Sequence, residues 1–67
     1  MNENDLNKLQ YVTEVVVSQI TGRALSTLRG DRHKGCGIPY YKMGKSVRYR
    51  LSDVYAYMED RRINTSE

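Results

Sequence analysis

The apolar side chains fall into short runs, and the spacing within each run predicts an element of secondary structure. The first run contains three consecutive valines, which favour a strand by propensity. The last of these, Val17, also lies three residues before Ile20, which is the spacing of one helix face. Thr13 suits a helix N-cap and Gly22 suits a helix end. We therefore predict a helix over Glu14–Thr21, with a strand as the alternative.

A second helix is predicted over Ala24–Arg32. Leu25 and Leu28 share one face of it, and Arg29 and Arg32 share another. The turn between the two helices contains a glycine, which is the outline of a helix-turn-helix. A loop with two glycines and a proline follows and ends the regular structure.

Apolar and polar side chains then alternate with a period of two, which predicts a β-hairpin. The odd positions are largely apolar: Tyr41, Met43, Val47, Tyr49 and Leu51. The even positions are mostly cationic: Tyr40, Lys42, Arg48 and Arg50. We place the turn at Gly44-Lys45-Ser46. One face of the hairpin, including Tyr41 and Tyr49, is expected to pack on the core, and the other to carry a row of positive charge.

The final apolar run predicts a third helix over Asp53–Arg62. Ser52 is a suitable N-cap, and Leu51, Val54 and Met58 fall on the inward side. The whole order is helix, turn, helix, loop, hairpin, helix. It predicts an α+β fold that is mainly α-helical.

Composition limits how such a fold is held together. The 67 residues suffice for one small domain. We expect it to span 11–63, with a flexible leader at 1–10 and a polar tail at 64–67. Cys36 is the only cysteine and His33 the only histidine, so neither an internal disulfide nor a four-ligand zinc site is available. The fold is therefore expected to rely on its apolar core, without a cofactor.

The same composition argues against two classes of protein. The longest uninterrupted apolar run is the three valines, far short of a membrane span. The polar, acidic start of the chain is unlike a secretory signal, so we expect a cytoplasmic protein with no membrane partner. One histidine, no cluster of metal ligands and too little chain to wall a pocket argue against an enzyme.

The positive charge is concentrated in the middle of the chain. The net charge of +3 divides into −2 over 1–22, +7 over 23–50 and −2 over 51–67. Asp31 is the only acidic residue in the middle segment. A basic block of this kind is expected of a protein that binds a polyanion such as nucleic acid.

Several short motifs in this order resemble a known family. They are Ile20-Thr21-Gly22, Thr27-Leu28, Gly37-Ile38-Pro39-Tyr40, Lys42-Met43-Gly44 and Val47–Val54. Together they resemble the small winged helix-turn-helix domains related to MerR regulators, in particular excisionases (recombination directionality factors) and AlpA-like prophage regulators. The resemblance covers Tyr11–Ile63 and implies that the valine run is helical. It departs at Ala24, where the family often has a capping Ser or Thr, so the cap is expected from Thr21 or water.

The resemblance implies that the second helix enters the major groove of DNA and that the hairpin acts as a wing along the phosphates. The expected contacts from the recognition helix are Arg23, Ser26, Thr27, Arg29 and Arg32. Those from the loop and wing are Lys34, Lys42, Lys45, Ser46, Arg48 and Arg50. Arg29 is the best candidate for a base contact, because arginine pairs bidentately with guanine.

The implied partners are double-stranded DNA, an integrase or other recombinase, and further copies of the chain bound cooperatively to DNA. An excisionase that bends attachment-site DNA is the main hypothesis, located at the bacterial nucleoid. An AlpA-like transcriptional regulator of a mobile element is the alternative. A protein-interaction module or antitoxin is a remoter one. RNA binding is disfavoured because the tyrosines fall on the expected core face and not on an exposed stacking platform.

Overall fold

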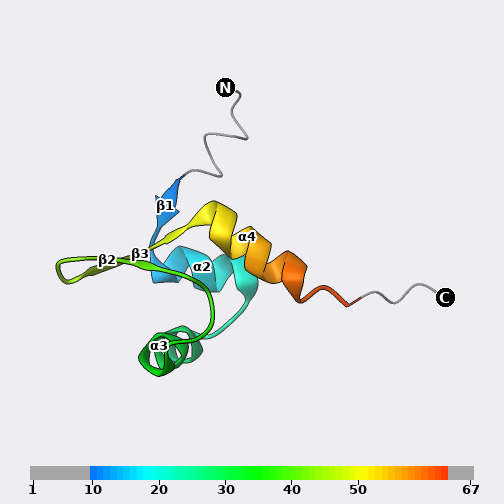
Figure 1. Cartoon of the computed structure of the whole chain (residues 1–67), viewed down its shortest axis with the longest axis horizontal. Helices are drawn as coiled ribbons and strands as arrows, with labels where there is room; N and C mark the ends of the chain where they lie inside the picture. Colours follow the sequence, from blue (N-terminus) through cyan, green and yellow to red (C-terminus); the bar gives the residue numbers. More distant parts are fainter. Residues whose placement is uncertain (1–9, 64–67) are drawn as a thin grey trace.

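The computed structural model describes residues 10–63, in which three helices and three antiparallel strands form a small α+β structure (Figure 1). The elements are β1 (Tyr11–Val12), α2 (Glu14–Thr21), α3 (Leu25–Lys34), β2 (Tyr41–Met43), β3 (Ser46–Arg50) and α4 (Leu51–Asp60). The predicted α+β class is confirmed. The predicted order is wrong in one respect, because it lacks β1. The predicted tail and all but the last residue of the predicted leader lie outside the described residues.

Strand β1 is formed by pairing with β3, which lies far along the chain. It pairs antiparallel with β3, with Tyr11 opposite Arg50 and Val12 opposite Tyr49, and the sheet order is β1-β3-β2. A two-residue strand has no period of its own, so only this long-range pairing defines it. The first element of the described residues is therefore a strand of the sheet and not a helix.

Helix α2 has the predicted bounds, because both of its ends are fixed by residues close to them in the sequence. The Thr13 hydroxyl accepts a hydrogen bond from the Val16 N–H at 3.4 Å. Gly22 ends the helix at a φ of 76°, in the left-handed region that glycine adopts at low cost. The helical interpretation of the valine run is confirmed.

Helix α3 differs at both ends from the prediction. It begins at Leu25, with Ala24 at the N-cap and no side-chain cap. The Thr21 hydroxyl accepts instead from the N–H of Arg23, inside the turn. The helix runs two residues beyond the predicted end and stops at Gly35, whose φ is 74°. The last turn consequently carries three basic side chains, where cations complement the helix dipole.

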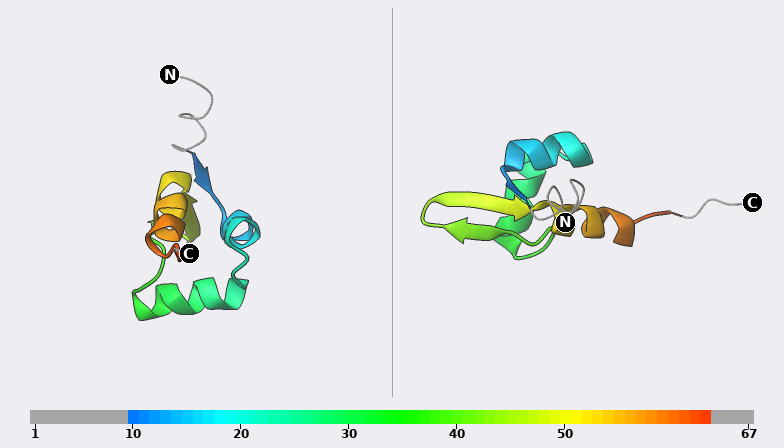
Figure 2. Two further views of the ribbon diagram at one scale, coloured as in Figure 1. Left: turned by 90° about the vertical axis from the view of Figure 1, so that its right-hand side faces the viewer. Right: turned by 90° about the horizontal axis from the view of Figure 1, so that it is seen from above.

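The core contains one buried side chain from each of five segments: α2, α3, the loop after α3, β3 and α4. Its buried members are Val17, Leu28, Ile38, Tyr49 and Val54. Leu25 packs against them as predicted. Met58, predicted to face inward, is 40% exposed, and Tyr57 packs on the core in its place. Figure 2 shows α3 lying crosswise beneath α2 and α4, with the β2–β3 hairpin extending away from the helices.

The hairpin has a turn of two residues, Gly44 and Lys45, and not the predicted three. Gly44 has a φ of 62°, as the first position of a type II′ turn requires. A two-residue turn pairs odd positions with even ones, so Tyr41 lies opposite Arg48, and Lys42 lies opposite Val47. Cross-strand partners share a face of the sheet. The two arms therefore place their apolar residues on opposite faces.

This register corrects the prediction of one apolar and one cationic face. On β3 the prediction is confirmed, because Tyr49 is 1% exposed. On β2 it is wrong, because Tyr41 and Met43 lie on the outer face and are 39% and 58% exposed. Lys42 projects from the face of Val47, so the expected row of positive charge is divided between two faces.

Helix α4 begins two residues before its predicted start and ends at Asp60, two residues before its predicted end. Strand β3 runs directly into it, with Arg50 at the N-cap and no side-chain cap. The Leu51 N–H donates to the Gln10 carbonyl at 2.9 Å. Pairing with the β1 segment therefore satisfies the first helical N–H, and the predicted Ser52 cap is wrong. Within residues 10–63, no helix has the length and apolar character to cross a membrane.

Candidate nucleic-acid interface

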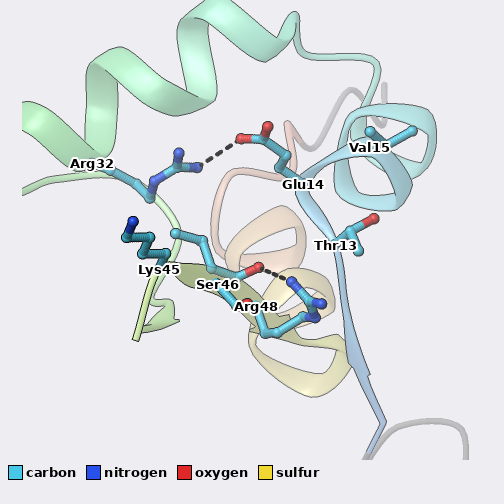
Figure 3. A pocket seen from close by; sticks show the side chains of 8 residues that line it. Thr13, Glu14, Val15, Arg32, Lys45, Ser46 and Arg48 are labelled. Atoms are coloured by element: carbon cyan, nitrogen blue, oxygen red, sulfur yellow. Dashed lines mark hydrogen bonds and ion pairs between the residues drawn. The ribbon is translucent and has the colours of Figure 1, made fainter. Parts of the chain in front are cut away.

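A cleft of about 470 Å³ lies where α2, α3 and the β2–β3 hairpin meet (Figure 3). The first turn of α2 contributes Glu14, and the last turns of α3 contribute Arg32. The hairpin contributes Lys45 at its tip and Arg48 on β3. Three of these four side chains are cationic, and two of the predicted wing cations meet a recognition-helix cation here. We call it the basic cleft.

Glu14 holds the predicted base-reading arginine. The Arg29 Nε donates to both carboxylate oxygens of Glu14 at 3.2 Å, and its Nη2 donates to Oε2 at 2.6 Å. The hydrogen bond from Arg29 lowers the pKa of Glu14, and Arg32 lowers it further against the opposing effect of burial. The carboxylate therefore stays ionised at neutral pH and ties the start of α2 to α3.

Arg32 joins this pair to the sheet. Its Nη1 lies 3.2 Å from Glu14 Oε1 and donates to the Tyr49 hydroxyl at 2.7 Å. Its side chain is only 17% exposed, and its guanidinium lies 5.8 Å from the ring centre of Tyr40. Arg32 is thus a structural link between α2, α3 and β3, with one edge on the basic cleft.

The sequence did not single out Glu14 as part of the site. Its arginine partner is fifteen residues away, so no helical or strand period connects them. The sequence shows only that Glu14 is an acidic residue in the first turn of a helix. Stabilisation of the helix dipole is enough to explain an acidic residue there.

Removing the Glu14 charge is expected to change how stability depends on pH. Its folded pKa is lowered, so its contribution is present above the unfolded pKa and is lost as pH falls through the folded value. Glu14→Gln should therefore destabilise the protein at pH 7 and lose less stability than wild type between pH 5 and pH 3. Urea unfolding across this range measures both effects. Glu59→Gln, whose carboxylate is exposed near Arg62, is the matched control. If the unfolding free energies of Glu14→Gln and Glu59→Gln depend on pH in the same way, the stabilising role given to the Glu14 carboxylate is wrong.

Two other predicted DNA contacts are paired inside the protein. The Arg23 Nη2 lies 2.7 Å from Asp31 Oδ2, and the Arg50 Nε lies 3.7 Å from Asp53 Oδ2. The first pair joins the turn before α3 to the second half of that helix. Neither arginine lines the basic cleft.

Four predicted cations make no ion pair within the described residues. They are Lys34, Lys42, Lys45 and Arg48. Lys34 ends α3 and Lys45 lies at the hairpin tip, both exposed. Arg48 donates from Nη1 to the Val47 carbonyl at 2.8 Å, which leaves its positive charge without a carboxylate. These groups favour an anionic ligand.

The polar residues Ser26, Thr27 and Ser46 are all exposed. Ser46 lines the basic cleft, whereas Ser26 and Thr27 lie on the first turn of α3, outside it. Of the eleven predicted contact residues, four line the basic cleft (Arg32, Lys45, Ser46 and Arg48) and the other seven lie outside it.

No family model, curated protein or solved structure matches this chain. Within residues 10–63, no three histidine, cysteine or carboxylate side chains gather as a metal site would require. Cys36 is a free cysteine and is exposed. The cations of the basic cleft are suited to binding a polymer that carries phosphates.

Proposed function

We propose that the protein binds double-stranded DNA as a winged helix-turn-helix, with α3 in the major groove and the β2–β3 hairpin as a wing. The observation that carries this proposal is the basic cleft, in which Lys45 at the hairpin tip lies beside Arg32 of α3 and Arg48 lines the same cleft from β3. Lysine and arginine side chains supply most of the affinity for DNA by releasing counterions from phosphates. The arrangement supports one continuous anionic ligand that spans helix and hairpin.

In this proposal Arg29 changes partner when DNA binds. Its side chain is 57% exposed while its guanidinium is bonded to Glu14, so part of Arg29 stays open to solvent. A guanine in the major groove offers two acceptors that match the arginine fork. Glu14 then holds Arg29 extended before binding, which reduces the conformational entropy lost on contact.

The proposed biological role is that of an excisionase, which bends attachment-site DNA beside a recombinase and has no catalytic step of its own. Cooperative binding of several copies and a location at the bacterial nucleoid belong to the same proposal. An AlpA-like transcriptional regulator would use the same interface on promoter DNA. Gel shifts on attachment-site and promoter duplexes separate the two, and binding to neither contradicts both.

Two arginine variants test the docking. Arg29→Ala should weaken binding to a preferred duplex, selected from a random pool, by about tenfold to a hundredfold and reduce discrimination against other duplexes. Arg48→Ala should weaken binding to every duplex by about fivefold at 150 mM salt, because one phosphate contact is lost. Fluorescence anisotropy measures both.

Arg62→Ala is the matched control, because Arg62 lies beyond the end of α4 and is 71% exposed. It should leave the affinity for both kinds of duplex within about twofold of wild type. If Arg29→Ala and Arg48→Ala also leave affinity at low salt unchanged, this docking is wrong.

A further inference from the structure

The outer face of the sheet exposes a group of apolar side chains that duplex binding does not use. Tyr11, Tyr41 and Met43 are 49%, 39% and 58% exposed. The sheet register places all three on the face opposite the core, and a groove of about 400 Å³ lies over them. We call these three residues the tyrosine face. Exposed apolar groups gathered in this way mark binding sites more often than scattered ones do.

The two rings of the tyrosine face are held in a fixed arrangement. Their centroids are 5.2 Å apart and their planes are perpendicular, at 88°. The Arg50 guanidinium lies 5.9 Å from the ring centre of Tyr41, and Asp53 lies 3.7 Å from that arginine. An edge-to-face pair occupies one face of one ring and leaves the other ring faces uncovered by the pair. Both rings stay part-exposed beside these contacts, so aromatic surface remains open to solvent.

The charge around this face selects the ligand. Arg48 shares this face with Tyr41, lines the groove and has no carboxylate partner within the described residues. Flat aromatic surface beside an unpaired cation is complementary to a nucleotide, whose base stacks on a ring while its phosphate meets the cation. A purely apolar peptide would leave the Arg48 charge without a partner.

We propose that the tyrosine face binds an unpaired nucleotide of single-stranded DNA, with its base stacked on Tyr41 or Tyr11 and its phosphate beside Arg48. Arg48 lines both this groove and the basic cleft, so a strand that leaves the cleft continues past it to the tyrosines. The choice of DNA over RNA rests on the proposed duplex binding. The stacking site itself is an addition to it, on a different face.

The test compares two probes of equal charge on the full chain. One is a fluorescein-labelled oligothymidine, and the other is an abasic phosphodiester oligomer of the same length. Wild type should bind oligothymidine about tenfold more tightly, because stacking adds to the phosphate contacts only when bases are present. Tyr41→Ala should abolish this preference and Tyr41→Phe should retain it. Tyr55→Ala, an equally exposed tyrosine on α4 outside the groove, should also retain it.

Several outcomes would overturn the proposal. These are equal binding of the two probes by wild type, a preference that survives in Tyr41→Ala, and tighter binding of oligouridine RNA than of oligothymidine. Sedimentation that shows a dimer lost in Tyr41→Ala would assign the face to a second copy instead. A parallel titration with duplex separates the two proposals. Duplex binding retained by Tyr41→Ala isolates a stacking defect, whereas wild type that binds neither probe nor duplex contradicts the proposed function itself.

Discussion

Tyr49→Ala should lose about 3–5 kcal/mol of unfolding free energy, the range for removing a large buried ring. Tyr49 is 1% exposed and is a member of the core cluster. Its hydroxyl also accepts from Arg32, so truncation leaves a cavity and removes one partner of that guanidinium. A chain of this size has a total stability of roughly 3–10 kcal/mol. A large fraction of the variant should therefore be unfolded at 25 °C, as measured by urea unfolding with far-UV circular dichroism.

Two matched substitutions separate the ring from the hydroxyl. Tyr49→Phe keeps the ring and should cost about 1.5–3 kcal/mol, the value of a hydrogen bond to a charged group. Tyr55→Ala removes a half-exposed ring from α4 and should stay within about 1 kcal/mol of wild type. If Tyr49→Ala is no more harmful than Tyr55→Ala, the core assigned to β3 is wrong.

Duplex affinity should fall by about 150-fold between 50 and 200 mM salt. About four phosphate contacts give a slope near −3.6 in log affinity against log salt. The four cations that the proposed docking places against phosphates are Arg32, Lys34, Lys45 and Arg48, while Arg29 contacts a base. Anisotropy titrations at four or five salt concentrations give the slope directly.

The variant Lys45→Gln provides an internal check on this slope. Lys45 lies exposed at the hairpin tip without an ion-pair partner among the described residues, so its loss should lower the magnitude of the slope by about 0.9. Glu14→Gln is expected to act in the opposite sense, because it removes the only carboxylate in the basic cleft. A slope near zero in wild type would mean that phosphates do not supply the binding energy.

The parts of the fold that sequence predicted well are those fixed by local chemistry. Helix α2 was bounded correctly because Thr13 and Gly22 act within one turn of its ends. The parts that it missed depend on partners far along the chain. Strand β1 is defined by β3, and the start of α4 is set by the Gln10 carbonyl. Neither dependence leaves a periodic pattern in its own segment.

The hairpin prediction was wrong because the turn has two residues and not the predicted three. The alternation of apolar and polar positions was read correctly on each arm. A three-residue turn would have placed the apolar positions of both arms on one face, whereas the two-residue turn at Gly44 and Lys45 places them on opposite faces. That shift exposes Tyr41, which the sequence assigned to the core, and creates the tyrosine face.

The basic segment was located from sequence, but its internal pairing was not. Charge counting found the +7 over 23–50. It did not reveal that Glu14, from outside this segment, binds Arg29 and Arg32. Ion pairs between elements depend on the helix crossing and on rotamers, which spacing along the chain does not encode. The proposed site therefore has fewer unpaired cations than its sequence suggests.

The most direct test of duplex binding by α3 and the hairpin is an NMR titration of the ¹⁵N-labelled chain with a short duplex at 50 mM salt. The account predicts amide shift changes concentrated in the last two turns of α3 and in residues 44–48. The exposed end of α4, from Tyr55 to Asp60, should change little. Changes confined to α4, or no change at a salt concentration where phosphate contacts are strongest, would contradict it.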